Sequence, residues 1–244
     1  MQPFGHYPVF GMNTKVNTMK SVFVSTLLLF FFVSAFAQNS QERNVGSFSE
    51  IKVGEAINLY LIQGSSEKIR VEADEDEIDD VETRVSGGTL KIGMKPGNYR
   101  HSVKVYVTYR KIDGITATSA SNVYSEGTVR SDQLEIAVSS AASAELEVEA
   151  ELLSISASSS GDVEISGTAN QAQVKVSSAG EVDAYDLVVD EMSVTASSAG
   201  DAKVFAKKSI QAHASSGGSV RYRGNPSQSQ TDSSSGGSVR KTGD

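Results

Sequence analysis

The sequence predicts an all-β protein, a right-handed parallel β-helix (β-solenoid) with coils of about 19 residues, preceded by a strand-rich N-terminal part of the same domain. Three observations lead to this fold class. A pattern of alternating apolar residues followed by a Ser-Ser pair recurs six times. The apolar residues keep the same place in every copy. No proline occurs between Pro96 and Pro226, as expected where central strands use every backbone donor.

Residues 1–37 are predicted to be a signal peptide, which would be absent from the mature protein. The stretch 22–37 is almost wholly apolar, follows Lys20 and ends in Ala-Phe-Ala, so we expect cleavage before Gln38. At about 16 residues this stretch is short for a membrane span. We therefore expect export to the periplasm or outer surface of a Gram-negative bacterium, with no membrane span left after cleavage.

The rest of the chain is expected to form a short linker, 38–44, and a single domain, 45–244. Either Met1 or Met19 is the natural start, and in the second case residues 1–18 are an upstream extension. The chain has no cysteine, so its stability comes from backbone ladders and packing rather than disulfides. A formal net charge of −8 disfavours nucleic acid and anionic membranes as partners.

Five alternating segments between residue 45 and about 115 predict the strands of the N-terminal part. These are Phe48–Val53, Ile57–Ile62, Lys68–Ala73, Thr89–Gly93 and Val103–Tyr109. Between them lies an acidic cluster, 74–80, and Ile78 within it is three residues before Val81. This cluster is either one helical turn packed on the sheet edge or a solvated loop that blunts the edge.

From about residue 115 onward, each copy contains two apolar alternations of period two. Such constant phase predicts that equivalent strands of successive coils pair in parallel and point the same residues inward. Seven coils result if 118–123 is a degenerate first copy. The first alternation is Leu134-Ile136-Val138, Leu153-Ile155-Ala157, Ala172-Val174-Val176, Met192-Val194-Ala196 and Ile210-Ala212-Ala214.

Each copy also contains a predicted corner, where a polar or small residue of one coil lies above that of the next. We expect the second serine of each pair to form a structural ladder through its hydroxyl group, and the glycine that follows to supply a positive φ. A binding stripe is the functional alternative. The corner residues are Ser140, Ser159, Ser178, Ser198, Ser216 and Ser235, with Gly161, Gly180, Gly200, Gly218 and Gly237.

Three carboxylates, Asp162, Glu181 and Asp201, follow these corners in register and are the candidates for a Ca²⁺ site. Against that interpretation, each coil supplies one carboxylate, whereas Ca²⁺ takes six or more oxygen ligands. Turn closure is the structural alternative, and we predict no metal site and no cofactor. The next outward row runs Glu145, Glu164, Asp183, Lys203, Arg221 and Arg240, with an ion pair expected between Asp183 and Lys203.

The chain resembles the auto-transporter adhesin head GIN domain family of exported bacterial proteins. The resemblance rests on "VGSFSEIKVGEAINLYLIQG", "GGTLKIGM" and the corner sequences "SSAGEV" and "SSAGDA", and it covers about Val45 to Thr242. It implies a right-handed β-helix, related in shape to pectate lyases, without a catalytic set. The family's Gly-Ile-Asn triplet does not occur here, where Ala56-Ile57-Asn58 is an approximate counterpart.

An enzyme is disfavoured because the chain has no Trp, no Cys and no Gly-x-Ser-x-Gly motif. His101 and His213 are expected at outward, solvated positions. We therefore predict a secreted, non-catalytic surface-interaction protein, adhesin-like or envelope-associated, that presents repeated polar faces to a glycan or an envelope protein. The alternatives are a protein-binding scaffold or sensor module of the envelope and a polysaccharide lyase-like β-helix enzyme. An end or edge of the solenoid is where a homo-oligomer would form.

Overall fold

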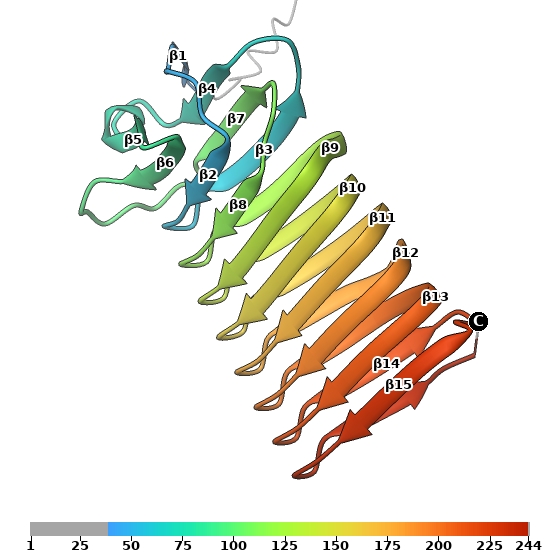
Figure 1. Ribbon diagram of the computed structural model, residues 1–244. Coiled ribbons are helices and arrows are strands. Elements are labelled where there is room, and N and C mark those ends of the chain that lie inside the picture. Colours follow the sequence, from blue (N-terminus) through green and yellow to red (C-terminus); the bar gives the residue numbers. More distant parts are fainter. Residues whose placement is uncertain (1–38, 244) are drawn as a thin grey trace, which may run out of the picture. The chain divides into compact units, whose positions relative to one another are not determined.

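The computed structural model describes residues 39–243, so the predicted signal peptide and cleavage point lie outside the described residues. The described part is a stack of β-strands that runs from an N-terminal group of short strands to the C-terminal coil (Figure 1). Residues 39–243 belong to one compact unit. The segment predicted as a linker contains a strand, β1 (Asn39–Arg43), which pairs antiparallel with a later strand and so belongs to the domain.

The N-terminal part contains all five predicted strands. It also contains three strands outside the five predicted segments: β1 and β5 (Val81–Ser86), which both carry many exposed polar residues, and the four-residue β8 (Gly114–Ala117). The acidic cluster ends in a single 3₁₀ turn, η1 (Ile78–Asp80), in which Ile78 is buried. The other strands here are β2 (Glu50–Val53), β3 (Asn58–Gln63), β4 (Lys68–Ala73), β6 (Thr89–Met94) and β7 (Lys104–Tyr109).

Antiparallel pairing is confined to this N-terminal end. Strand β4 pairs antiparallel with both β1 and β7, and β5 pairs antiparallel with β6. By contrast β2 pairs in parallel with β6 and β8, and β3 pairs in parallel with β7 and β9. The antiparallel strands therefore cover the first edge of the parallel stack, which blunts an otherwise open edge.

The repeats form a parallel β-solenoid of about seven turns, as predicted. Ala157 pairs with Val138 in the coil before it and with Val176 in the coil after it, so one turn takes 19 residues. The strands of the solenoid are β9 (Asn122–Ser139), β10 (Ser143–Ser158), β11 (Asp162–Val176), β12 (Glu181–Ala196), β13 (Asp201–Ala214), β14 (Ser219–Arg223), β15 (Gln228–Ser233) and β16 (Ser238–Lys241).

The predicted inward residues are buried and line a narrow core. Ile136, Ile155 and Val174, which occupy the same place in three successive coils, are each at most 1% exposed. Their neighbours two residues away are also buried. Like side chains therefore stack over like, and each coil obtains its apolar contacts from the coils on either side.

Each coil closes through a tight turn at the Ser-Ser pair. The N–H of Gly180 donates to the Ser177 carbonyl at 2.9 Å, and the two residues between them, Ser178 and Ala179, both have positive φ, at 51° and 57°. This is the geometry of a type I′ turn. Equivalent turns close the other copies, and similar turns at 54–57 and 118–121 extend the corner stack to the N-terminal coils.

The corner glycines have a different role from the predicted one. Positive φ occurs at the second serine and the residue after it, while Gly161, Gly180, Gly200, Gly218 and Gly237 are absent from the positive-φ residues of the described chain. These glycines instead pass close to the preceding coil. A Cβ on Gly180 would lie 2.7 Å from the Ala157 carbonyl oxygen, a distance that real Cβ atoms essentially never show. At these five corners the backbone of the preceding coil therefore leaves no room for a Cβ.

The second corner of each coil lies where the apolar phase shifts by one residue. In β10, Ala150 and Leu153 are both buried, and the two residues between them, Glu151 and Leu152, are both exposed. The same pair of outward residues occurs at 170–171 in β11. The strand continues through this corner, so each coil has two long sides joined by one tight turn and one wider bend (Figure 1).

Candidate functional site

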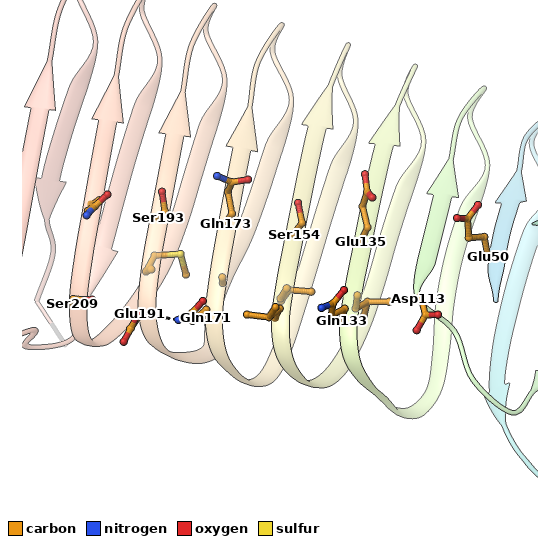
Figure 2. Close-up of a pocket in the computed structure, with 16 residues that line it drawn as sticks. Glu50, Asp113, Gln133, Glu135, Ser154, Gln171, Gln173, Glu191, Ser193 and Ser209 are labelled. Carbon is orange, nitrogen blue, oxygen red and sulfur yellow. Dashed lines mark hydrogen bonds between the residues drawn. The ribbon is translucent and has the colours of Figure 1, made fainter.

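The side of the solenoid that follows the wider bend carries two outward rows of mostly uncharged polar side chains. They flank a groove of about 670 Å³, which we call the amide groove. One row is Glu135, Ser154, Gln173, Ser193 and Gln211, and the other is Gln133, Leu152, Gln171, Glu191 and Ser209. Figure 2 shows side chains of both rows projecting from successive strands.

The register of the strands fixes the spacing of the two rows. Gln133 pairs with Leu152, which pairs with Gln171, so each coil contributes one residue per row at the strand spacing of about 4.8 Å. Between the rows lie buried apolar residues of the core, and Ala172 is the smallest of them along the groove. The groove therefore runs across the strands, with repeated polar groups along both sides.

The amide groove contains one exposed apolar side chain. Leu152 is 42% exposed, and the other large apolar residue with such exposure in the described chain is Val188, at 40% and away from the groove. Gln171 Nε2 donates to Glu191 Oε2 at 3.2 Å. At the N-terminal end, Glu50 lies in register two coils before Glu135, and Thr89 donates to its carboxylate at 2.8 Å.

The opposite side of the solenoid is highly charged and forms a second set of rows. The predicted acid-to-base row is in register, and it continues beyond the repeats into three stacked tyrosines of the N-terminal coils. Tyr60 stacks on Tyr106 and Tyr124 with ring centroids 4.8 and 5.3 Å apart, and Arg70 lies 4.0 Å above the Tyr106 ring. The full row is Arg70, Tyr106, Tyr60, Tyr124, Glu145, Glu164, Asp183, Lys203, Arg221 and Arg240.

The three candidate Ca²⁺ ligands lie in register on this charged side, and basic residues contact two of them. Lys203 Nζ lies 3.0 Å from both Glu181 and Asp183, and Arg221 lies 2.7 Å from Asp201. Hydrogen bonds to Asp183 and then to Glu181 raise the pKa of Lys203. Within residues 39–243, no group of three or more His, Asp or Glu side chains is arranged to hold a metal ion.

Asp162 is the member of this set whose charge is least compensated. Partial burial and the neighbouring charge of Glu181 raise the pKa of its carboxyl group. Its neighbours on either side are Ser143 and Glu181, in the row formed by strand pairing. Lys203 and Arg221 therefore compensate the charges of Glu181 and Asp201, while the charged strand neighbour of Asp162 is the acidic Glu181.

The two histidines of the domain each lie beside a carboxylate rather than standing alone in solvent. His101 Nδ1 is 3.0 Å from Asp74, and His213 Nδ1 is 3.0 Å from Asp232. Both rings keep substantial exposure, with side chains 54% and 43% accessible. Both histidines therefore lie at outward, exposed positions, as predicted, and each has a carboxylate neighbour that the sequence did not indicate.

The corner serines join successive coils through main-chain hydrogen bonds. The second serine of each pair is exposed, and its carbonyl accepts from the N–H of the residue after the equivalent serine in the preceding coil. Ala179 donates in this way to Ser198 at 3.1 Å. The bonds that join successive corners are thus backbone bonds, in place of the hydroxyl ladder that we expected.

Sequence reasoning did not predict the amide groove. The alternation indicates which residues point outward, but the groove depends on the wider bend. The signal for that bend is a pair of adjacent outward residues between two apolar sets, such as Glu151 and Leu152.

The described residues contain no helix long and apolar enough to cross a membrane.

Together, the stacked coils and their long outward rows define the molecule as a parallel β-solenoid with extended polar faces. Its family can be assigned from the sequence match. The chain belongs to the family described as "Putative auto-transporter adhesin, head GIN domain", whose model matches residues 47–226. No curated protein matches the chain.

Solved bacterial structures share the fold. A putative adhesin from Bacteroides fragilis NCTC 9343 is 19% identical, with a TM-score of 0.76, over 84% of this chain and 96% of that one. A putative adhesin from Parabacteroides merdae ATCC 43184 is 19% identical, with a TM-score of 0.67, over 84% and 95%. A putative lipid binding protein from Parabacteroides distasonis ATCC 8503 is 22% identical, with a TM-score of 0.62, over 84% and 96%. At these identities the similarity establishes the fold alone.

Proposed function

We propose that this protein is a secreted, non-catalytic surface-interaction protein, adhesin-like or associated with the cell envelope, that binds a glycan or protein ligand along a solenoid face. Family membership supports an adhesin-like role. The observation that carries the proposal is the amide groove, which crosses successive coils and is lined by at least one polar side chain from each of them. Repeated weak contacts at fixed spacing add to a useful total affinity for a repeating ligand.

The location of the proposed site follows from the contrast between the two sides. On the charged side, Lys203 and Arg221 already form ion pairs with Glu181, Asp183 and Asp201. On the amide side, Gln173 and Gln211 extend from exposed positions. A ligand on the amide side would displace water rather than break existing ion pairs, which costs less free energy.

The proposal is tested by fractionation and binding together. We expect antibodies to detect the protein in the periplasmic or surface fraction, and we expect the purified protein to bind isolated envelope material saturably. We expect no release of reducing or unsaturated sugar from polysaccharides during prolonged incubation. A purely cytoplasmic location, or steady turnover of a polysaccharide, would contradict the proposal.

A protein-binding scaffold is the second candidate, and the last coil favours it. All six residues of β15 are exposed, and its strand partner in the described chain is β13 on one side. An unpaired strand edge can accept an extended segment of another protein by strand addition. Deleting residues 226–243 would abolish binding of such a partner, whereas binding along the amide groove would persist.

A further inference from the structure

The lining of the amide groove is acidic at intervals and neutral between them. Glu50, Asp113, Glu135 and Glu191 are its charged residues, and none of the 16 residues that line it is basic. Lys111 lies outside the lining and forms an ion pair with Asp113 at 3.3 Å. The groove therefore has a negative potential, which opposes an anionic ligand such as a uronate, a sulfated glycan or a phosphate headgroup.

Between the carboxylates the groove presents amide and hydroxyl groups. Gln171 and Gln173 each combine donors with an acceptor, and Ser154 and Ser193 do the same with one atom. This mixture matches sugar hydroxyl groups, which also donate and accept. Carboxylates such as Glu135 accept hydrogen bonds from hydroxyl groups without requiring a positive partner. The polar chemistry therefore fits an uncharged polyol.

The apolar contact in the groove is Leu152, between Gln133 and Gln171 in its row. A pyranose ring has apolar C–H faces as well as polar edges, so a ligand lying along the row can cover this side chain while its hydroxyl groups reach the amides. Covering an exposed leucine is favourable, since buried apolar surface contributes about 25 cal/mol per Å². A pyranose unit is also similar in length to the strand spacing of about 4.8 Å.

We propose that the amide groove binds an uncharged glycan chain that lies across the coils, with its C–H surface on Leu152 and its hydroxyl groups on the glutamine and serine rows. This inference rests on the proposed function and specifies its ligand class. Each coil contributes one contact per row, so affinity increases with glycan length until the groove is filled. The interaction involves little net charge and therefore depends weakly on salt.

The test uses the full-length purified protein on an array of neutral glycans (glucans, mannans, galactans and their oligosaccharides) and anionic ones (alginate, polygalacturonate, heparin). Titration calorimetry then follows the strongest neutral ligand. We expect the double variant Gln171→Ala/Gln173→Ala and the variant Leu152→Ala each to lose at least tenfold in affinity. The matched control Val188→Ala removes an equally exposed apolar residue outside the groove and is expected to stay within twofold. Equal melting temperatures show that the variants are folded.

Each other result overturns the glycan inference, and the results differ in what they imply for the proposed function. The protein could instead bind only anionic glycans or an envelope protein, with that binding lost in the groove variants. This result would keep the surface-binding role and rule out an uncharged glycan as the ligand. If the protein binds a neutral glycan and the variants Gln171→Ala/Gln173→Ala and Leu152→Ala leave the affinity unchanged, the groove is not the binding site. No binding to array or envelope removes both proposals.

Discussion

At the residue scale, the corners combine an unfavourable local conformation with favourable contacts between coils. Ser178 and Ala179 both adopt positive φ although neither is glycine, which costs roughly 1–2 kcal/mol per residue. The cost is offset because the N–H of Ala179 donates to the next corner, at Ser198. The glycine occurs one position later, at Gly180, where space rather than φ requires it. Sequence alone indicates that small residues cluster here. It does not indicate which of them must adopt a positive φ and which must lack a Cβ.

This division of roles predicts opposite effects for two neighbouring substitutions. Ala179→Gly removes the strain at φ 57° and increases unfolded-state entropy, with an expected net stabilisation of up to about 1 kcal/mol. Gly180→Ala places a Cβ against the Ala157 carbonyl and is expected to destabilise the fold by about 1–3 kcal/mol. Urea unfolding followed by circular dichroism measures both. Stabilisation by Gly180→Ala would contradict the observed close approach between coils.

A second residue-scale prediction concerns Asp162, whose pKa is raised in the folded protein by burial and then by the charge of Glu181. The folded state therefore holds this proton to a higher pH than the unfolded chain does, so ionisation of Asp162 costs stability above its folded pKa. We expect Asp162→Asn to stabilise the protein at neutral pH by well below about 1 kcal/mol, because the site is partly exposed. This advantage should fade as the pH falls through the pKa of Asp162 toward its ordinary value.

The matched control is Asp201→Asn, in the same row one coil beyond Glu181. It removes the carboxylate that Arg221 contacts at 2.7 Å, so it is expected to give no stabilisation at neutral pH. Thermal unfolding between acidic and neutral pH compares the two variants. Equal gains from both would mean that general charge repulsion, rather than the local environment of Asp162, determines the effect.

At the element scale, the period-two alternation of apolar residues is sufficient to predict the strands that line the core and insufficient to predict the others. Strand β4 begins and ends where the alternation predicts, since one of its faces is fully buried. Strand β1 is polar along its length, and its pairing with β4 depends on residues about 30 positions later in the chain. The tyrosine stack likewise depends on register between distant strands, because Tyr60 and Tyr124 belong to separate coils. Local sequence carries no signal for such long-range pairings.

The last coil departs from the apolar pattern of the preceding ones at its inward positions. Ile210 is followed in register by Ser229, Ala212 by Thr231 and Ala214 by Ser233. Terminal repeats with polar surfaces keep a solenoid soluble, because the core would otherwise be open at its end. We infer that these three residues end the core without offering an apolar surface for another copy.

Restoring the apolar pattern is therefore expected to cause self-association. In the triple variant Ser229→Ile/Thr231→Val/Ser233→Ala, the inward residues match those of the preceding coil beside an unpaired strand edge. We expect its molecular mass by light scattering to rise with protein concentration, while the wild type is less affected. The control Gln228→Ile/Gln230→Val adds apolar residues at outward positions of β15 and should associate less. Equal association of both variants would show that added hydrophobicity alone is responsible.

At the scale of the whole molecule, the coils behave as repeated units whose contacts are mainly with their neighbours. The fold class, the coil length and the inward residues all follow from the constant phase of the apolar pattern, because each coil repeats the same arrangement of strands and turns. The amide groove and the charged side arise only when the coils are stacked. Their outward residues differ from coil to coil, so the sequence repeat does not reveal which side is suited to binding.

This modular arrangement predicts that one complete coil can be removed without loss of the fold. Deleting residues 158–176 joins Ala157 to Ser177, its equivalent continuation, and brings β10 beside β12 in the original register. The variant should keep its β-sheet circular dichroism and cooperative unfolding, at reduced stability, and should be shorter by about 4.8 Å. Deleting 158–166 instead shifts the inward residues and is expected to prevent folding. Because the complete deletion also removes Gln171 and Gln173, it should weaken glycan binding, whereas a folded variant with full affinity would place the ligand outside the amide groove.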